Sequence, residues 1–415
     1  MSIIENNNIS FNNVISLIEN TDKIYLSDTT KSKVIKCYDL VKKLSNKKEA
    51  VYGINTGFGP LCSKKISIEE IELLQKNLLL SHSVGVGEPI DPFISKIMML
   101  CKIISLSKGY SGIRLEIIER LIYFLKNDLI PVVPQQGSVG ASGDLAPLSH
   151  LFLPLIGMGY FWKGKEKITA ELILKKHHLE PFKLEAKEGL ALINGTQFIL
   201  AHTIQGLSKL DYIFDLADLA AAMTLEGFQG SIAPFKKELH DLRPYNGSRK
   251  VASRMLMLLK NSQNTKSHIN CERVQDPYSI RCVPQVHGAS RNALNHLKEL
   301  VNIEINSVTD NPIILENGSS ISGGNFHGQL LALAIDYLIV AVSEMGNISD
   351  RRIYLLLEGL HGLPEMLCEN PGLNSGLMVT QYTTAALVSE NKSMCFPVSS
   401  DSIPTGMGQE DHVSM

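Results

Sequence analysis

The stretch 330-LLALAIDYLIVAV-342 is apolar almost all the way round a helix. A surface helix carries a single apolar stripe, so this segment predicts a helix that is buried on every side, as at the centre of a bundle. Asp336 interrupts it, and its thirteen residues fall short of the ~20 that a membrane span requires. Helical spacing of apolar residues recurs along the second half of the chain, at 214–225, 291–301, 327–344 and 382–391.

The first third of the chain reads differently. Ser67 and Glu70 form a capping-box pair, and the apolar residues that follow share one helical face until glycines end the helix near His82. We therefore expect a mainly α-helical protein with two parts. A mixed N-terminal part, residues 1–110, carries Tyr52 and His82. A long antiparallel helical bundle follows over residues 111–415, and we expect it to be cut short at its C-terminus.

Composition excludes several classes of protein. Lys and Arg total 40 against 42 Asp and Glu, giving a net charge of -2, which argues against a protein built on phosphate contacts. The 44% hydrophobic content argues against disorder. Seven cysteines are scattered without a C-x-x-C pair, which indicates free thiols in a reducing compartment. With no basic and apolar leader at the N-terminus, we expect a cytoplasmic protein.

Familiar catalytic signatures are missing. Gly159 and Gly164-Lys165 have the spacing of a phosphate-binding loop, but Glu166 stands where Ser or Thr should bind magnesium. Ser142 lacks the second glycine of a G-x-S-x-G elbow. His177-His178 lies in a Lys-rich stretch, so we expect no metal site.

The informative segment is 140-GASGD-144. Small residues like these ordinarily mean a turn. If the backbone bends tightly enough, however, the amide nitrogen of Gly143 can attack the carbonyl carbon of Ala141. Loss of water from this ring closure and from Ser142 would leave a methylidene-imidazolone, an electrophile made from the chain itself. Gly143 suits this chemistry because its nitrogen is unhindered and its backbone tolerates strained angles.

The longer string GSVGASGDLAPLSH, residues 137–150, resembles the aromatic amino-acid ammonia-lyase family, whose members make this electrophile. Further strings that resemble family motifs follow in the family's order across nearly the whole chain: YGINTGFGP at 52–60, LSH at 80–82, INGTQ at 193–197, QDPYSIRC at 275–282, SVTDNP at 307–312, GGNFH at 323–327, ENPGLNSG at 369–376 and GQEDHVSM at 408–415.

The resemblance implies a role for each matching residue. Ala141-Ser142-Gly143 forms the only cofactor, with none bound from outside. Tyr52 is the base that removes the substrate's β-proton, which requires a lowered pKa. Asp276-Pro277 also looks like a helix start, which places Tyr278 and Arg281 on one face. Arg281 can bind the substrate carboxylate bidentately. The cavity would further contain the catalytic Tyr278 and the substrate-binding residues Asn194, Gln275 and Phe326.

The pair Ser81-His82 resembles the histidine-using members, and a carboxylate at Glu410 can accept a hydrogen bond from an imidazole. Elimination of ammonia from L-histidine, giving trans-urocanate, is therefore the favoured reaction. Departures at 328–330, 398–400 and 406–408 keep a phenylalanine or tyrosine lyase, or a 2,3-aminomutase, open. A truncated, non-catalytic helical assembly protein is the alternative of another class. The resemblance also implies a homotetramer with shared active sites, and neither nucleic acid nor membrane as partner.

Overall fold

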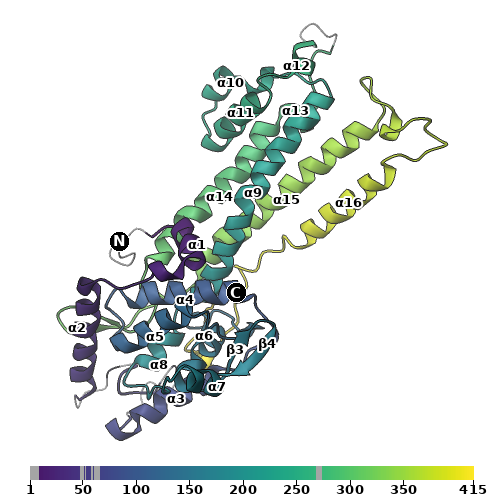
Figure 1. The fold of residues 1–415 in the computed structure, drawn as a ribbon. Coiled ribbons are helices and arrows are strands. Elements are labelled where there is room, and N and C mark those ends of the chain that lie inside the picture. The colour runs from purple at the N-terminus through teal and green to yellow at the C-terminus, as the bar shows by residue number, and fades with distance from the viewer. Residues whose placement is uncertain (1–8, 47–50, 52, 58, 60–65, 268–272) are drawn as a thin grey trace. The chain divides into compact units, whose positions relative to one another are not determined.

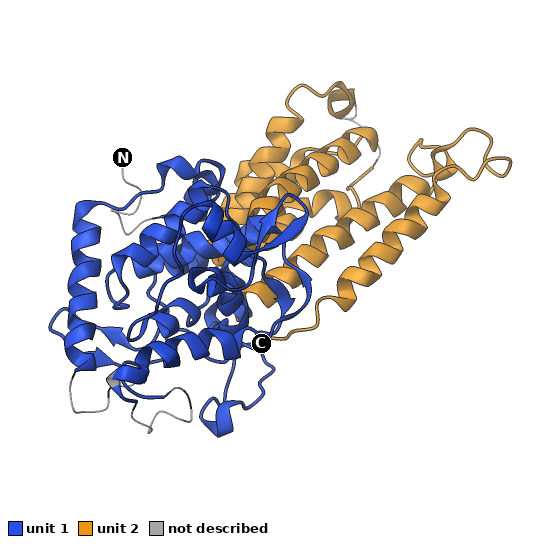
Figure 2. Cartoon of the chain, turned by 60° about the horizontal axis from the view of Figure 1, so that its bottom comes forward, with its two compact units in different colours: residues 1–205, 299–332, 399–415 blue, residues 206–298, 333–398 orange. Residues whose placement is uncertain are grey.

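The computed structural model describes residues 9–46, 51, 53–57, 59, 66–267 and 273–415, and it is mainly α-helical. Its contacts divide the chain into two compact units (Figure 2). Unit 1 comprises residues 1–205, 299–332 and 399–415, and unit 2 comprises residues 206–298 and 333–398. The boundary expected near residue 110 is not where the contacts divide the chain. The helices on either side of that point pack against each other inside unit 1.

Unit 1 contains eight helices and three short antiparallel strand pairs among the described residues. The pairs are β1 with β2, β3 with β4, and β5 with β6. The helices are α1 (Phe11–Glu19), α2 (Asp28–Ser45), α3 (Ile71–His82), α4 (Pro92–Leu106), α5 (Leu115–Lys126), α6 (Leu145–Phe152), α7 (Ala170–Lys176) and α8 (Glu188–Ile193). The strands are β1 (Val86–Pro89), β2 (Pro134–Gln136), β3 (Tyr160–Lys163), β4 (Glu166–Thr169), β5 (Ile313–Ile314) and β6 (Ser320–Ile321).

Three long helices contribute residues to both units, and the remaining helices belong to unit 2. The long helices are α9 (Gln197–Gly227), α14 (Val283–Ile305) and α15 (Gln329–Leu357). The helices of unit 2 alone are α10 (Lys237–Asp241), α11 (Asn246–Leu258), α12 (Gln263–Ser267), α13 (Tyr278–Arg281) and α16 (Met378–Ser393).

The expected antiparallel bundle is confirmed in unit 2, where α9, α14, α15 and α16 lie side by side (Figure 1). Polar contacts fix the relative direction of α15 and α16. Between α15 and α16, Asp350 accepts a hydrogen bond from Thr384, and Cys395, just beyond α16, reaches the backbone of Ile339. The residue numbers rise on one helix as they fall on the other, so the two run antiparallel.

The prediction that 330–342 is buried on every side is wrong for this chain. Leu330, Leu333 and Val340 are 70%, 54% and 54% exposed. The helix buried almost all round is instead α4, whose residues from Ile97 to Leu106 are nearly inaccessible because α1 and α5 cover it. Among the described residues α15 is also the one helix long and apolar enough, by length and composition, to cross a membrane.

Candidate active site

The turn Gly140–Gly143 connects the segment after β2 to the start of α6. The Gly143 amide donates a hydrogen bond to the Gly140 carbonyl at 3.3 Å, which closes a tight turn around Ala141 and Ser142. Ser142 has φ +55°, in a region that residues with a Cβ rarely adopt. The backbone is therefore tightly bent at Ala141 and Ser142.

Close packing makes glycine necessary at position 143. Gly143 has φ +81° and forms a bridge with Gly195, and a Cβ built on it would lie 2.3 Å from the Gly195 carbonyl oxygen. Real Cβ atoms do not approach backbone this closely, so a side chain would displace the turn. The turn at residues 140–143 therefore packs directly against Gly195, without room for a side chain between them.

We expect Gly143→Ala to prevent ring formation, because the turn must move away from Gly195 before a methyl group fits. Intact-mass measurement of the purified variant would show the unmodified chain. Gly164→Ala is the matched control, since Gly164 also has positive φ (+61°) but has no atom near its Cβ position. Full loss of two waters in Gly143→Ala would contradict the steric argument.

Asn194 follows α8 directly and is 2% exposed. Its Nδ2 donates to the Ser142 carbonyl oxygen at 2.5 Å. Its Oδ1 is buried and has no hydrogen-bond partner among the described residues. A buried acceptor without a partner is costly, so this oxygen is available for a donor on a bound molecule.

Glu410 holds the other side of Ser142. One carboxylate oxygen, Oε1, accepts a hydrogen bond from the Ser142 hydroxyl at 2.9 Å, and Oε2 accepts one from Thr405 at 2.8 Å. The Thr405 amide also donates to the Glu410 carbonyl at 2.8 Å, which fixes the backbone that carries the carboxylate. The structure therefore brings Ser142, Asn194 and Glu410 together, although they are distant in sequence.

His82 is the last residue of α3, as the sequence predicts. Its Nδ1 lies 2.8 Å from the Leu78 carbonyl and 3.0 Å from the Ser81 hydroxyl. A carbonyl can only accept, so Nδ1 carries the proton and Nε2 remains an acceptor. Burial lowers the pKa of His82, against the opposing effects of the Leu78 carbonyl and the negative charge of Glu410. Burial therefore favours the neutral form of this side chain.

The lowered pKa of His82 predicts a pH-dependent contribution to stability. Below the ordinary histidine value of 6.5 the unfolded chain binds a proton that folded His82 resists. This contribution to the free energy of unfolding is fully present above pH 6.5 and is lost as the pH falls below it. Urea denaturation of the protein and of His82→Gln at pH 7.5 and 5.5 should show the unsubstituted protein losing more stability. An equal loss in both would contradict the assignment.

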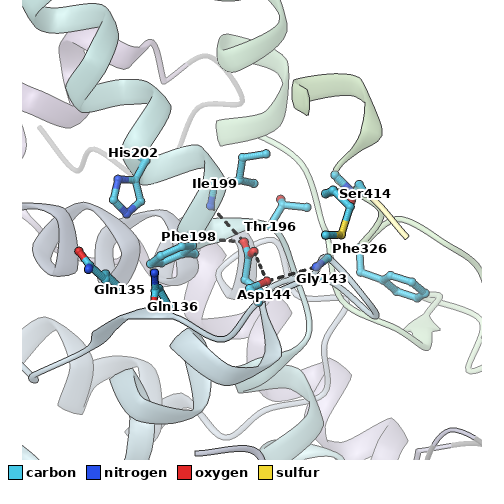
Figure 3. Close-up of a pocket in the computed structure, with 14 residues that line it drawn as sticks. Gln135, Gln136, Gly143, Asp144, Thr196, Phe198, Ile199, His202, Phe326 and Ser414 are labelled. Atoms are coloured by element: carbon cyan, nitrogen blue, oxygen red, sulfur yellow. Dashed lines mark hydrogen bonds between the residues drawn. The ribbon is translucent and has the colours of Figure 1, made fainter. Parts of the chain in front are cut away.

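A cavity of about 580 Å³ opens beside the turn (Figure 3). Gly143, Asp144 and Phe326 are among the residues that line it. His202 also lines it, with its ring against Phe198 at 4.6 Å between centroids. In the described part of the chain no group of three or more His, Cys, Asp or Glu could hold a metal ion.

Asp144 is a site residue that the sequence reasoning did not single out. It is 5% exposed, and its carboxylate accepts hydrogen bonds from the Ser138 hydroxyl and from the amides of Phe198 and Ile199 in the first turn of α9. Burial raises its pKa to about 6, while these hydrogen bonds act in the opposite direction. Its place directly after Ala-Ser-Gly was the available signal.

Three of the predicted residues lie in the other compact unit. Gln275, Tyr278 and Arg281 belong to unit 2, whereas Ser142 and its partners belong to unit 1. Tyr278 is 70% exposed, and the Arg281 guanidinium lies 4.5 Å from the centre of its ring, so the two share a face as predicted. Tyr52 lies outside the described residues.

The predicted helix start at Asp276-Pro277 is partly wrong. Pro277 is the residue that precedes α13, and Asp276 does not cap the helix. Its carboxylate binds the Ser231 amide at 2.6 Å and Arg273 at 2.9 Å instead. The carboxylate oxygens of Asp276 therefore make tertiary contacts and do not cap the helix.

Comparison with known proteins agrees with this architecture. The chain is 45% identical to the histidine ammonia-lyase of Stigmatella aurantiaca over 415 residues, covering 99% of this chain and 81% of that protein. The crystal structure of histidine ammonia-lyase from Trypanosoma cruzi has a TM-score of 0.87 at 40% identity, covering 98% of this chain and 77% of that one. Tyrosine aminomutase from Streptomyces globisporus has a TM-score of 0.90 at 31% identity, covering 98% and 81% respectively.

The helical fold and these likenesses define a carbon–nitrogen lyase. The sequence profile of the family described as aromatic amino acid lyase matches residues 9–415, and the chain belongs to that family.

Proposed function

We propose that this protein eliminates ammonia from L-histidine to give trans-urocanate, using an electrophile made from Ala141-Ser142-Gly143. One observation carries the proposal: Ser142 sits in a left-handed turn with its carbonyl bound by Asn194 and its hydroxyl bound by Glu410. The residues present fit the ring, because the glycine whose nitrogen must attack is the one that can carry no Cβ.

The methylidene-imidazolone would supply an electron-deficient carbon that makes the substrate's amine a better leaving group. The side chains position the substrate around it. The unpartnered Oδ1 of Asn194 can accept a hydrogen bond from the substrate's ammonium group. Arg281 binds the carboxylate through its paired N–H groups. Tyr52 takes the β-proton, Tyr278 assists it, and Gln275 and Phe326 complete the wall of the site.

Two groups favour an imidazole as the substrate's ring. Nε2 of His82 is an acceptor in the tautomer that the Leu78 carbonyl imposes, so it can bind a ring N–H. Glu410 offers a carboxylate, which would be costly beside a phenyl ring because nothing there could donate to it. The names of the relatives in Stigmatella and Trypanosoma point to the same substrate.

A second candidate is aminomutase or lyase activity on phenylalanine or tyrosine, favoured by the close structural likeness to tyrosine aminomutase. Incubation of the purified protein with each of the three amino acids separates the candidates. We expect ultraviolet-detected urocanate from L-histidine alone. Cinnamate, coumarate or a β-amino acid would contradict the proposal.

We further infer a cytoplasmic homo-oligomer, a tetramer in the family pattern, in which Gln275, Tyr278 and Arg281 reach the turn of another copy. The exposed apolar residues along α15 and α16, such as Leu333 and Tyr382, support such an assembly because large apolar faces mark interaction surfaces. The five described cysteines are free, in keeping with a reducing compartment. Light scattering of the purified chain would give its mass in solution, and a monomer with full activity would contradict shared sites.

A further inference from the structure

Lys102, near the C-terminal end of α4, carries a buried amine that lies outside the cluster around Ser142. Its side chain is fully buried, and its Nζ donates to the backbone carbonyl of Asn194 at 2.7 Å. Removing an ammonium group from water is expensive unless the group is well bound. Burial lowers the pKa of Lys102 to about 7, while the negative charges of Asp310 and Asp144 act to raise it. Because burying a lysine side chain is costly, the contacts of Lys102 should show what this side chain does in the structure.

The carbonyl that Lys102 binds belongs to the segment on which the reacting turn rests. Asn194 Nδ2 donates to the Ser142 carbonyl at 2.5 Å, and the Gly195 carbonyl accepts from the Asp144 amide at 2.8 Å. Two successive residues thus hold both ends of the Ser142–Asp144 stretch. Asn194 and Gly195 are joined by one peptide group, and Lys102 donates to the carbonyl oxygen of that group.

Ring formation requires that the Asn194–Gly195 segment keep its position while the turn closes. The Gly143 nitrogen must bond to the Ala141 carbonyl carbon, whose oxygen leaves as water with the Gly143 and Ser142 amide protons. The second water takes the Ser142 hydroxyl and the proton on its Cα. The bond between the Gly143 nitrogen and the Ala141 carbon forms only while the two atoms are held close together. The residues that contact the turn must therefore be rigid.

We propose that Lys102 is a positioning residue for ring formation, holding the Asn194–Gly195 peptide rigid while the Ala141–Ser142–Gly143 turn closes against it. This inference rests on the proposed function, since it concerns how the electrophile of that function arises. Lys102 acts through Asn194 and contacts no reacting atom. A lysine is suited to the task because its long side chain can span from α4 to the end of α8.

Lys102→Met tests the proposal, because methionine fills much of the same space without a donor. Whole chains are purified at increasing times after synthesis, and intact mass gives the fraction that has lost two waters. We expect ring formation to slow by about tenfold or more, the effect of losing a hydrogen bond from a charged donor. Lys102→Arg, which keeps a cationic donor, should recover most of the rate.

The matched control is Lys187→Met. Lys187 is also fully buried, but it binds the Ser111 carbonyl and Asp310 instead of the turn. We expect this variant to lower the melting temperature and still lose both waters at the unsubstituted rate. Lys102→Gln is a second test, since its shorter amide retains polarity but falls short of the Asn194 carbonyl.

Rapid and complete water loss in folded Lys102→Met or Lys102→Gln would overturn the proposal. So would failure of both variants to fold while Lys187→Met folds, because Lys102 would then be needed for the fold alone. Slowing in Lys187→Met equal to that in Lys102→Met would overturn it as well. If the unsubstituted chain keeps both waters, the proposed function itself fails, an outcome distinct from the others.

Discussion

Ser142→Ala should lower kcat for L-histidine by roughly 10³-fold or more, because loss of a covalent catalytic group commonly costs that much or more. Alanine has no hydroxyl to lose, so the second water cannot leave and no electrophilic carbon forms. The carbonyl that Asn194 binds is retained, and the fold should be unchanged. Steady-state formation of urocanate, followed by its ultraviolet absorption, measures the effect.

Ser138→Ala is the control for this substitution. Ser138 lies in the same loop and donates to Asp144 at 3.1 Å, but it supplies no atom to the ring. The substitution removes this hydrogen bond and the weaker one that Ser138 accepts from the Gly140 amide at 3.3 Å, so it should cost about tenfold. Activity in Ser142→Ala comparable to that in Ser138→Ala would show that elimination proceeds without the electrophile.

Glu410→Gln should lower kcat by about 10²–10³-fold, the range expected for removing a group that exchanges protons or binds charge in the transition state. Glutamine preserves size and can still accept from Thr405, so folding should be little affected. What is lost is the negative charge beside Ser142, which is 2.9 Å away in the chain before ring formation. Intact mass should be measured alongside kcat, because it separates a failure of ring formation from a failure of catalysis.

Thr405→Val is the companion variant, since it removes one hydrogen bond to Glu410 and leaves the carboxylate in place. Its effect should stay within about tenfold. If Glu410→Gln were no more impaired than Thr405→Val, the carboxylate would serve only to hold the local structure, and the proposed recognition of imidazole would lose one of its two supports.

Local signals predicted local structure well. The helix before His82 ends where glycines follow, as predicted. The capping box predicted at Ser67 and Glu70 is not formed: α3 begins at Ile71 without a side-chain cap, and the Ser67 hydroxyl instead donates to the Glu70 carboxylate at 2.9 Å. The first turn differs in detail, because residues 68–70 form a 3₁₀ turn ahead of α3. Helix ends depend on residues within about four positions of each other, so they can be predicted from the local sequence.

Burial could not be predicted in the same way, because it depends on what covers a helix. The stretch 330–342 is more uniformly apolar than most of the chain, yet Leu330 is 70% exposed while Lys102 in α4 is fully buried. Composition records that a face is apolar but not whether another segment or another copy covers it. In α15, Leu331 and Leu338 belong to the core of this chain, whereas Leu330 and Leu333 are exposed.

The candidate site could be proposed from sequence where its chemistry depends on contiguous residues, and not where it depends on tertiary contacts. Ala141, Ser142 and Gly143 could be proposed because the ring would be made from neighbours in sequence. Asp144 and Lys102 could not be given roles, because the contacts that matter come from α9 and from Asn194. The sequence also did not show that Gln275, Tyr278 and Arg281 belong to a different compact unit from Ser142.

The central claim is that this chain makes its own electrophile, and intact-mass spectrometry of the purified, folded protein tests it most directly. We predict a mass lower than that of the encoded chain by two water molecules, with the loss located by peptide mapping to the segment containing Ala141-Ser142-Gly143. An unmodified mass in folded protein would contradict the account, and would favour a helical assembly protein without this catalysis.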